Sequence, residues 1–347
     1  MAWPRILPFH LKFADSRVLA QQIDARWVAS GLRARVLLPL GIALVLLVLA
    51  IGSLIVNARL QASQKDAART ATAVDTMLRE TTATEVQAMQ TAIELMMADE
   101  RLEAAFRARD RQALQALSAP ILARLLSRNH VSQFYYILPD RTTLLRVHAP
   151  RLHGDRVDRA SLRQAERTGQ PAWASEHGPL STLTVRVVHP WRIDGQVAGY
   201  LELGVPFQHL AEEIQHAYGV DLLVAIDKSR FNAAQWEAVQ KVNPRPVAWD
   251  EFPGVVLPTR TTEDIPAGVR DYLAAPDRRQ GSGSSFETDW GKRVARVFAL
   301  PFKLDGERFG ELIVLQDVSE GVRERRLAVG QIALPLAGIG GALMLLF

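Results

Sequence analysis

Cationic side chains interrupt two predicted strands in the first half of the chain. In residues 143–148, strand alternation places Arg146 and His148 on one face. In residues 183–190, the same alternation places Arg186 opposite to its apolar neighbours. Long cationic side chains on a half-buried face need a partner, and a guanidinium group matches a carboxylate through two parallel hydrogen bonds. We therefore predict that the three side chains bind one small anionic ligand, a carboxylate or an amino acid.

A carboxylate lies close in sequence to these cations. Asp155 directly follows Gly154 and could accept the ammonium group of an amino acid, in which case it belongs to the ligand site. Alternatively, Asp155 pairs with Arg146 in a structural ion pair that closes the loop over the sheet. The sequence is compatible with both interpretations.

Three aromatic residues complete the candidate ligand site. We predict that Tyr135, Tyr136 and Trp173 form an aromatic wall of the pocket. Aromatic residues on strands also pack commonly in hydrophobic cores, so core packing is the alternative for each of them.

Histidines are concentrated in the middle of the chain, where six of the eight fall between His148 and His216. A metal site would take His148, His153 and His189 as ligands and Asp155 as a fourth. None of these residues has the helical or paired-strand spacing that identifies a zinc site in a sequence. We therefore predict no metal site, and no cofactor, in this chain.

The composition excludes several other functions. The chain has no cysteine, which rules out disulfides, thiolate metal sites and cysteine nucleophiles. Its net charge of +4 over 347 residues is too diffuse for nucleic-acid binding. No nucleophile with a plausible base and no glycine-rich nucleotide-binding loop is visible. We expect a binding protein without enzymatic activity in these residues.

A long helix is predicted before the first strand. Residues 57–119 contain neither Gly nor Pro and are rich in Ala, Gln, Glu, Arg and Met, which favour a helix. Asp99 and Asp110 are plausible N-caps that divide the run into one long and two shorter helices. One apolar seam follows helical spacing: Val74, Leu78, Val86, Met89, Ile93 and Met97. The seam indicates either packing against the chain's own domain or a parallel homodimer with the seam at its twofold axis.

Two hairpins follow the helical region. Residues 133–150 contain two apolar runs around a Pro-Asp turn, and residues 183–206 contain two more around the Asp194-Gly195 turn. A loop and a short helix lie between the hairpins. The expected fold class is α+β, a small antiparallel sheet with helices on one side.

The second half of the chain repeats the first. Five residues recur at an offset of 111: Pro190, Asp194, Gly195, Gly199 and Leu201 in the first copy, and Pro301, Asp305, Gly306, Gly310 and Leu312 in the second. The same five-residue register within similar apolar sequence indicates a tandem duplication. We expect a first module at residues 129–210, after a helical lead-in at 57–128, and a second module at 211–320.

Two uncharged stretches are long enough to cross a bilayer, residues 36–56 and residues 327–347. Three arginines in residues 26–35 precede the first stretch, so the positive-inside rule places residues 1–35 in the cytoplasm and the modules outside. The three arginines in residues 323–326 argue for the opposite orientation, and the usual dominance of the first helix decides between them.

The last residue, Phe347, coincides with the end of the second stretch, and no basic or aromatic interface residues follow it. We expect a cytoplasmic output domain beyond this residue. The alternative is a membrane-anchored binding or assembly protein that does not signal and ends at the second span.

The segment FYYILPDRTTLLRVHAPRLHGD, residues 134–155, resembles a known family. An aromatic strand followed by an Arg, a His, a Pro and a Gly-Asp pair is similar to the double Cache sensor regions of bacterial transmembrane receptors. The likeness covers about residues 59–326, with two tandem PAS-like modules after a long helix. The resemblance implies a homodimeric receptor in the bacterial inner membrane with a periplasmic sensor region. Its output would be a diguanylate cyclase, a histidine kinase or a chemoreceptor, in that order of expectation.

The resemblance also implies the position of the ligand. It carries over Arg146, His148, Gly154 and Asp155 as motif positions, and it makes the first, membrane-distal module the one expected to bind. The chain departs from the family pattern at residues 135–136, where a histidine is common and this sequence has two tyrosines.

Overall fold

The computed structural model describes residues 16–177, 183–231, 233–240, 248–275, 285–304 and 307–327, and the single residues 330, 338 and 341. The chain divides into two compact units, residues 65–319 and the remainder, and the fold below is that of residues 65–319. No helix among the described residues is long and apolar enough to cross a membrane. The predicted span at 327–347 falls mostly outside the described residues.

Three helices precede the first strand, as predicted. They are α1 (Ser16–Met97), α2 (Glu100–Arg107) and α3 (Arg111–Asn129). The carboxylate of Asp99 accepts two backbone N–H groups in the first turn of α2, and Asp110 does the same for α3. Both predicted N-caps are confirmed.

The first sheet contains both predicted hairpins. Its five antiparallel strands have the order β2-β1-β5-β4-β3, and α4 lies between β2 and β3 in the sequence. The bounds are β1 (Gln133–Ile137), β2 (Thr143–Arg146), α4 (Ala160–Thr168), β3 (Ala172–His177), β4 (Leu183–Ile193) and β5 (Gln196–Pro206).

A second sheet repeats this arrangement after α5 (Phe207–Tyr218), with the order β7-β6-β10-β9-β8. Here α7 takes the place of α4. The bounds are β6 (Val220–Asp227), η1 (Lys228–Arg230), α6 (Ala233–Gln240), η2 (Trp249–Glu251), β7 (Val255–Arg260), α7 (Ala267–Ala274), β8 (Ser285–Trp290), β9 (Arg293–Leu304) and β10 (Glu307–Asp317).

The duplication extends to the pairing of the strands. Pro190 pairs with Tyr200 in the first sheet, and Pro301 pairs with Glu311 in the second, which is the predicted offset of 111 in both strands. The predicted turn at 305–306 lies outside the described residues. The tandem repeat is confirmed by strand order and register together.

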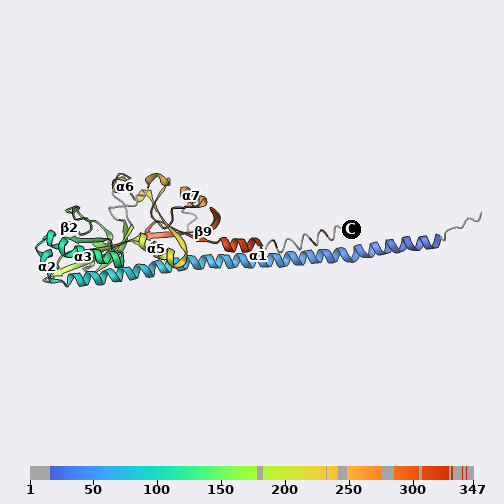
Figure 1. The fold of residues 1–347 in the computed structure, drawn as a ribbon, viewed down its shortest axis with the longest axis horizontal. Coiled ribbons are helices and arrows are strands. Elements are labelled where there is room, and N and C mark those ends of the chain that lie inside the picture. The colour runs from blue at the N-terminus through green and yellow to red at the C-terminus, as the bar shows by residue number, and fades with distance from the viewer. Residues whose placement is uncertain are drawn as a thin grey trace, which may run out of the picture. The chain divides into compact units, whose positions relative to one another are not determined.

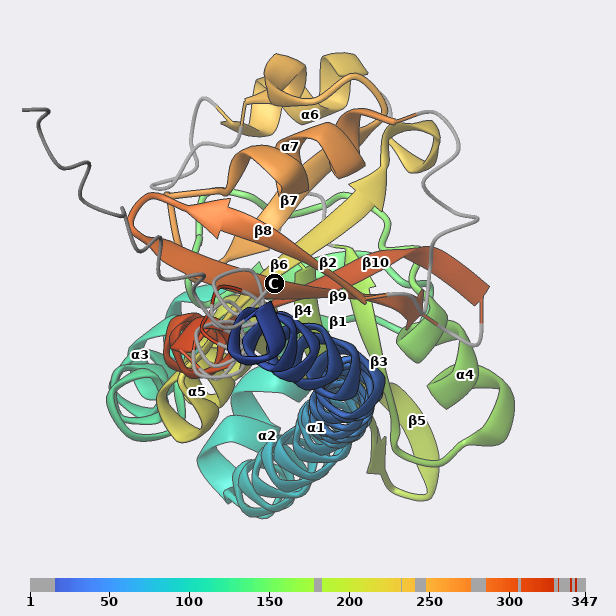
Figure 2. The same ribbon diagram turned by 90° about the vertical axis from the view of Figure 1, so that its right-hand side faces the viewer.

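Each sheet is covered by helices on both faces, whereas the sequence predicted helices on one side only. One face of each sheet contributes to a shared apolar core that includes residues of α1, α2, α3 and α5. The other face of the first sheet packs on α4, and that of the second sheet packs on α7. Figures 1 and 2 show α7 on the side of the second sheet away from α5.

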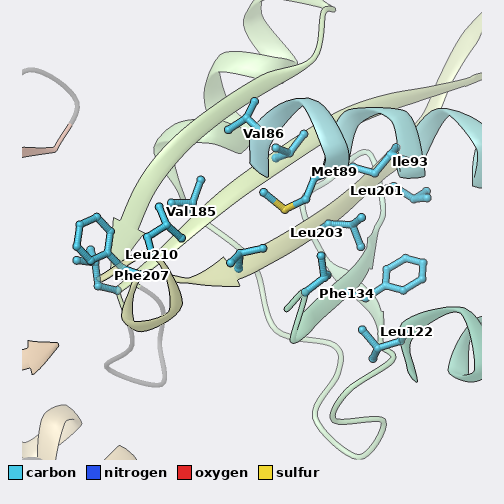
Figure 3. Packing of buried hydrophobic residues seen from close by; sticks show 14 of the residues in the cluster. Val86, Met89, Ile93, Leu122, Phe134, Val185, Leu201, Leu203, Phe207 and Leu210 are labelled. Carbon is cyan, nitrogen blue, oxygen red and sulfur yellow. The ribbon is translucent and has the colours of Figure 1, made fainter. Parts of the chain in front are cut away.

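The apolar seam of α1 packs inside this core. Val74 and Ile93 are fully buried and Met89 is 1% exposed within a single chain. Figure 3 shows Met89 and Ile93 directed towards strand residues such as Leu201 and Leu203. The seam therefore packs against the chain's own domain along most of its length, which is the first of the two interpretations, while Leu78 and Met97 remain partly exposed.

One glycine in each module permits a close approach of two strands. A Cβ atom at Gly310 would lie 1.9 Å from the carbonyl oxygen of Ala225, and one at Gly199 would lie 2.4 Å from that of Ile137.

Gly310→Ala is therefore expected to lower the free energy of unfolding by about 2–3 kcal/mol, because the backbone must move. Gly321→Ala, where a Cβ meets nothing within 4 Å, is the control. Equal melting temperatures for the two variants would contradict the expectation.

Candidate functional site

The face of the first sheet that packs on α4 carries a group of charged side chains. Tyr135 of β1 pairs with Arg146 on one side and with Glu202 of β5 on the other, so the three side chains share this face. Arg186 of β4 lies on the same face, because it pairs with Gly204, two residues beyond Glu202 on β5. Strand alternation thus brings together two cations that the sequence predicted and an acid that it did not.

The charged side chains of this face are almost completely buried. Five of them have an exposure of 8% or less: Arg146, Arg159, Arg186, Glu176 and Glu202. Three guanidinium groups surround the ring of Tyr135, at 5.3, 4.8 and 5.7 Å from its centroid for Arg146, Arg159 and Arg186. We call these five residues and Tyr135 the charged cluster. Its cations lie within the range of cation–π attraction to one ring.

One carboxylate, that of Glu202, holds two of the three cations. Arg186 Nη1 donates to Glu202 Oε1 at 2.6 Å, and Arg159 donates to the same oxygen. Glu176 accepts the backbone N–H of Ser161 at 2.6 Å, near the start of α4. Burial raises the pKa of Glu176, although the backbone hydrogen bond and the nearby arginines oppose this.

The third cation is paired with the loop after β2. Arg146 makes a two-pronged ion pair with Asp155, at 2.8 and 2.6 Å, and donates to the carbonyl of Leu152 at 2.7 Å. Backbone hydrogen bonds of Thr143 with Gly154 and Asp155 hold this loop against β2. The ion pair considered in the sequence analysis is therefore present. Asp155 remains half-exposed, and its bond to Arg146 lowers its pKa.

Several buried polar atoms near Tyr135 make no hydrogen bond within the described residues. Two of these atoms are nitrogens, Arg186 Nε and His148 Nε2. The other two are carboxylate oxygens, Glu176 Oε2 and Glu202 Oε2. Arg186 Nε and Glu176 Oε2 are 3.9 Å apart, too far for a hydrogen bond. A buried polar atom without a hydrogen bond lowers the stability of the folded chain unless a ligand or a water molecule forms a hydrogen bond with it.

The tautomer of His148 follows from its neighbour. The backbone N–H of Phe134 donates to His148 Nδ1 at 3.1 Å, and the carbonyl oxygen of Phe134 lies 3.3 Å from the same nitrogen. We assign the proton to Nε2, because only an unprotonated Nδ1 can accept the shorter of these two contacts. The imidazole packs edge-on against Tyr135, with the ring centroids 4.9 Å apart. A neutral His148 therefore offers one buried N–H donor beside the charged cluster.

Burial lowers the pKa of His148 to about 4. In the unfolded chain this imidazole takes up a proton near pH 6.5, whereas in the folded chain it does so only near pH 4. Its contribution to the free energy of unfolding is therefore complete above pH 6.5 and is lost as the pH falls towards 4. The loss attributable to this group is about 3 kcal/mol. We expect His148→Asn to reduce the fall in melting temperature between pH 7 and pH 4.5, whereas His153→Asn on the exposed loop should not. Parallel curves for the parent and His148→Asn would exclude this role.

A cavity opens at the edge of the charged cluster. Its volume is about 350 Å³, within the range of small-molecule sites. It is lined by Tyr135, Arg146, Ala149, Arg151, Leu152, His153 and Asp155. The ring of Tyr135 and the guanidinium of Arg146 thus belong both to the cavity wall and to the charged cluster.

Among its described residues, the second module keeps one cation of this cluster, because Arg260 pairs with Leu223 as Arg146 pairs with Tyr135. At the positions of Tyr135, Arg186 and Glu202 it has Leu223, Val297 and Ile313, by strand pairing and the offset of 111, and all three are fully buried. The same fold is therefore stable with apolar side chains at these positions. Because a buried ion pair is seldom more stable than apolar packing, the charges of the first module indicate a function there.

Two predicted site residues lie elsewhere. Tyr136 points to the opposite face, where its hydroxyl is 2.8 Å from Ser118 Oγ in the shared core. Trp173 pairs with Val187, a shared-core residue, and lines a separate groove beside α1. Neither residue lines the cavity beside Tyr135. Successive strand residues alternate faces, so Tyr135 and Tyr136 cannot line the same pocket.

Sequence reasoning missed three members of the cluster. Glu202 was detectable in principle, as a lone acid within the apolar strand at 196–206. Arg159 and Glu176 gave no such signal, because they stand among other polar residues in the segment around α4. Their role depends on which strands are neighbours.

Comparison with known proteins places the chain in a family. The model of the dCache_3 family, described as the double sensory domain of two-component sensor kinase, matches residues 60–322. No curated protein matches the chain.

Several solved structures are similar to the chain in fold. The periplasmic domain of LuxQ from Vibrio cholerae has a TM-score of 0.44 at 13% identity, covering 70% of this chain and 98% of that one. The sensor domain of the histidine kinase DctB from V. cholerae has 0.38 at 12%, covering 69% and 94%. The ligand-binding domain of the chemoreceptor PctB from Pseudomonas aeruginosa, in complex with L-Arg, has 0.31 at 14%, covering 70% and 93%. The family match alone carries the assignment.

Proposed function

Because the chain belongs to the dCache_3 family of double sensory domains of two-component sensor kinases, we propose that its first module is the ligand-sensing part of a transmembrane receptor. The ligand lies between Tyr135 and the loop that carries Asp155. The observation that supports this most directly is the set of buried donors and acceptors without hydrogen bonds beside Tyr135. Tyr135, Arg186 and Glu202 are replaced by buried apolar residues at the matching positions of the second module.

The chemistry of these atoms favours a ligand with both charges, an amino acid. Its carboxylate would accept from His148 Nε2 and from a guanidinium of the cluster, and its ammonium group would donate to Glu202 Oε2 or to Asp155. A simple carboxylate would satisfy the donors and leave the buried acceptor oxygens without a partner. Amino acids are therefore preferred over other small anions.

We further propose how the sensor is placed in the cell. The stretches 36–56 and 327–347 cross a bacterial inner membrane, residues 1–35 lie in the cytoplasm, and the modules at 129–210 and 211–320 lie in the periplasm. The receptor is a parallel homodimer whose interface avoids the buried seam of α1. Its output is one of the three types expected from the sequence, a diguanylate cyclase, a histidine kinase or a chemoreceptor, and the description of the family supports the histidine kinase.

A ligand screen tests the proposed function. The full chain, purified in mild detergent, is heated with each common amino acid and with a set of dicarboxylates. One or a few amino acids should raise the melting temperature in a concentration-dependent way, because a ligand that binds only the folded state stabilises it. Calorimetric titration then gives the affinity. If no amino acid or carboxylate binds, the charges of the first module are structural and the protein fits the alternative, a membrane-anchored assembly protein.

A further inference from the structure

A second group of ionisable side chains lies away from the charged cluster. Glu85 on α1 faces His209 and Glu213 on α5, and one ligand-type atom from each lies within 4.8 Å of the others. His209 and Glu213 are one helical turn apart, the spacing at which two side chains of a helix meet one ligand. The ring of His130, at the end of α3, stacks on His209 with a centroid distance of 3.5 Å.

The polar atoms of this group lack good partners. Glu85 Oε2 and His209 Nε2 are buried from solvent and make no well-aligned hydrogen bond among the described residues. His209 Nε2 lies 3.4 Å from Glu213 Oε1, at the long end of the hydrogen-bonding range. Two carboxylates and an imidazole nitrogen therefore converge without a group that satisfies them.

The electrostatics of the group would be relieved by a cation. Burial and the nearby charge of Glu213 raise the pKa of Glu85. Burial and the neighbouring His130 lower the pKa of His209. A bound divalent ion would offset the repulsion between the two carboxylates and would use the lone pair of the imidazole.

We propose that Glu85, His209 and Glu213 form a binding site for a divalent transition metal, with zinc as the best match. Mixed imidazole and carboxylate ligands suit zinc, whereas calcium and magnesium prefer oxygen ligands alone. Zinc bonds of about 2.0–2.2 Å place tetrahedral ligands roughly 3.4 Å apart, so ligand atoms that lie within 4.8 Å of one another need to approach by at most about 1.4 Å. A water would complete the coordination.

The site would connect two elements of the sensor. Glu85 belongs to α1, and α5 joins the last strand of the first sheet to the first strand of the second. A metal held by both helices would fasten α1 at the junction of the two modules. This inference is independent of the amino-acid site, because the two groups share no residue.

A competing account keeps the group free of metal. In it, Glu85 is protonated and shares its proton with Glu213, while His209 and Glu213 form an ordinary surface pair along α5. The two accounts differ in one measurable property, the binding of a metal at this place.

The test uses the full chain in mild detergent after removal of metals with a chelator. Zn²⁺ is titrated in competition with a chromophoric chelator, and Co²⁺ is added separately to record its visible absorption. We expect one tight Zn²⁺ per chain and the absorption of a four- or five-coordinate Co²⁺ site. His209→Ala and Glu213→Gln should each weaken Zn²⁺ binding by tenfold to hundredfold or more, since even the loss of a residue that only hydrogen-bonds to a metal ligand has an effect of about that size.

Two matched controls accompany these variants. His216→Ala on α5 and Glu80→Gln on α1 remove exposed side chains of the same types on the same helices, and should bind Zn²⁺ as the parent does. Glu213 is 42% exposed on its side chain, so Glu213→Gln should fold even if a change at Glu85 does not. No stoichiometric Zn²⁺ in the parent, or equal affinity in the parent, His209→Ala and Glu213→Gln, overturns the proposal. Neither result affects the ligand screen.

Discussion

Replacing Glu202 by glutamine is expected to lower the free energy of unfolding by about 3–5 kcal/mol, the usual cost of removing one partner of a buried ion pair. Glu202 is fully buried, and one of its oxygens accepts from both Arg186 and Arg159. Glutamine keeps the size of the side chain and removes its charge. Two buried guanidinium groups are then left with Glu176 as the remaining buried acid of the cluster.

Thermal unfolding of the full chain measures this loss. For a unit of this size the expected fall in melting temperature is roughly 6–20 °C. Glu94→Gln is the control, because the Glu94 side chain is 64% exposed and a surface change of this kind costs at most about 0.5 kcal/mol. A fall of less than 2 °C for Glu202→Gln would mean that the buried ion pairs contribute little. Such a result would contradict the expectation that the charged cluster stabilises the fold.

The second prediction concerns the affinity for the ligand. Arg146→Ala should weaken binding of the amino acid found in the screen about tenfold to hundredfold, which corresponds to one lost charge-assisted contact of about 1.5–3 kcal/mol. Arg146 lines the cavity, and its guanidinium is already held in place by Asp155 and Leu152. Its donors are therefore oriented before the ligand arrives. Calorimetric titration gives the two affinities.

Three further variants make this test specific. Arg146→Lys keeps the charge but not the planar fork of donors, so it should restore only part of the affinity. Asp155→Asn should weaken amino acids more than simple carboxylates, because it removes a partner of the ammonium group. Arg167→Ala, an exposed arginine of α4, should bind as the parent does. If Arg146→Ala melts far below the parent and the parent binds no anion, Arg146 and Asp155 form only a structural ion pair.

Local sequence was sufficient for much of the fold. Asp99 and Asp110 are N-caps because a short carboxylate preceding a helix accepts the free N–H groups of its first turn. Both hairpins of the first module follow from period-two patterns interrupted by turn residues. The repeat offset of 111 predicted a second sheet with the strand order and register of the first. All these features depend on residues that are close in the sequence, or on comparison of the sequence with itself.

The candidate site was predictable only in part. Alternation along a strand placed Arg146 and His148 on one face, and the structure brings both beside Tyr135. The same alternation excludes Tyr136 from that face, so assigning both tyrosines to one pocket overlooked the strand period. Trp173 was misplaced for a different reason, because which face of an edge strand meets a pocket depends on the register with its neighbour.

Tertiary structure alone decided which charges meet and which apolar face is covered. Arg159 and Glu202 are 43 residues apart, and they touch because β5 is the central strand of the sheet and Arg159, directly before α4, reaches it across the same face. The spacing of the α1 seam was equally compatible with packing against a partner chain and with packing against its own sheet. In the structure it packs against its own sheet. The local sequence determines where the apolar side chains of each helix and strand lie. The order of the strands, and which face packs on which helix, follow from covering the apolar faces of all elements at the same time. That is the physical reason why the sequence of this protein predicted its elements and its repeat but not the full charged cluster.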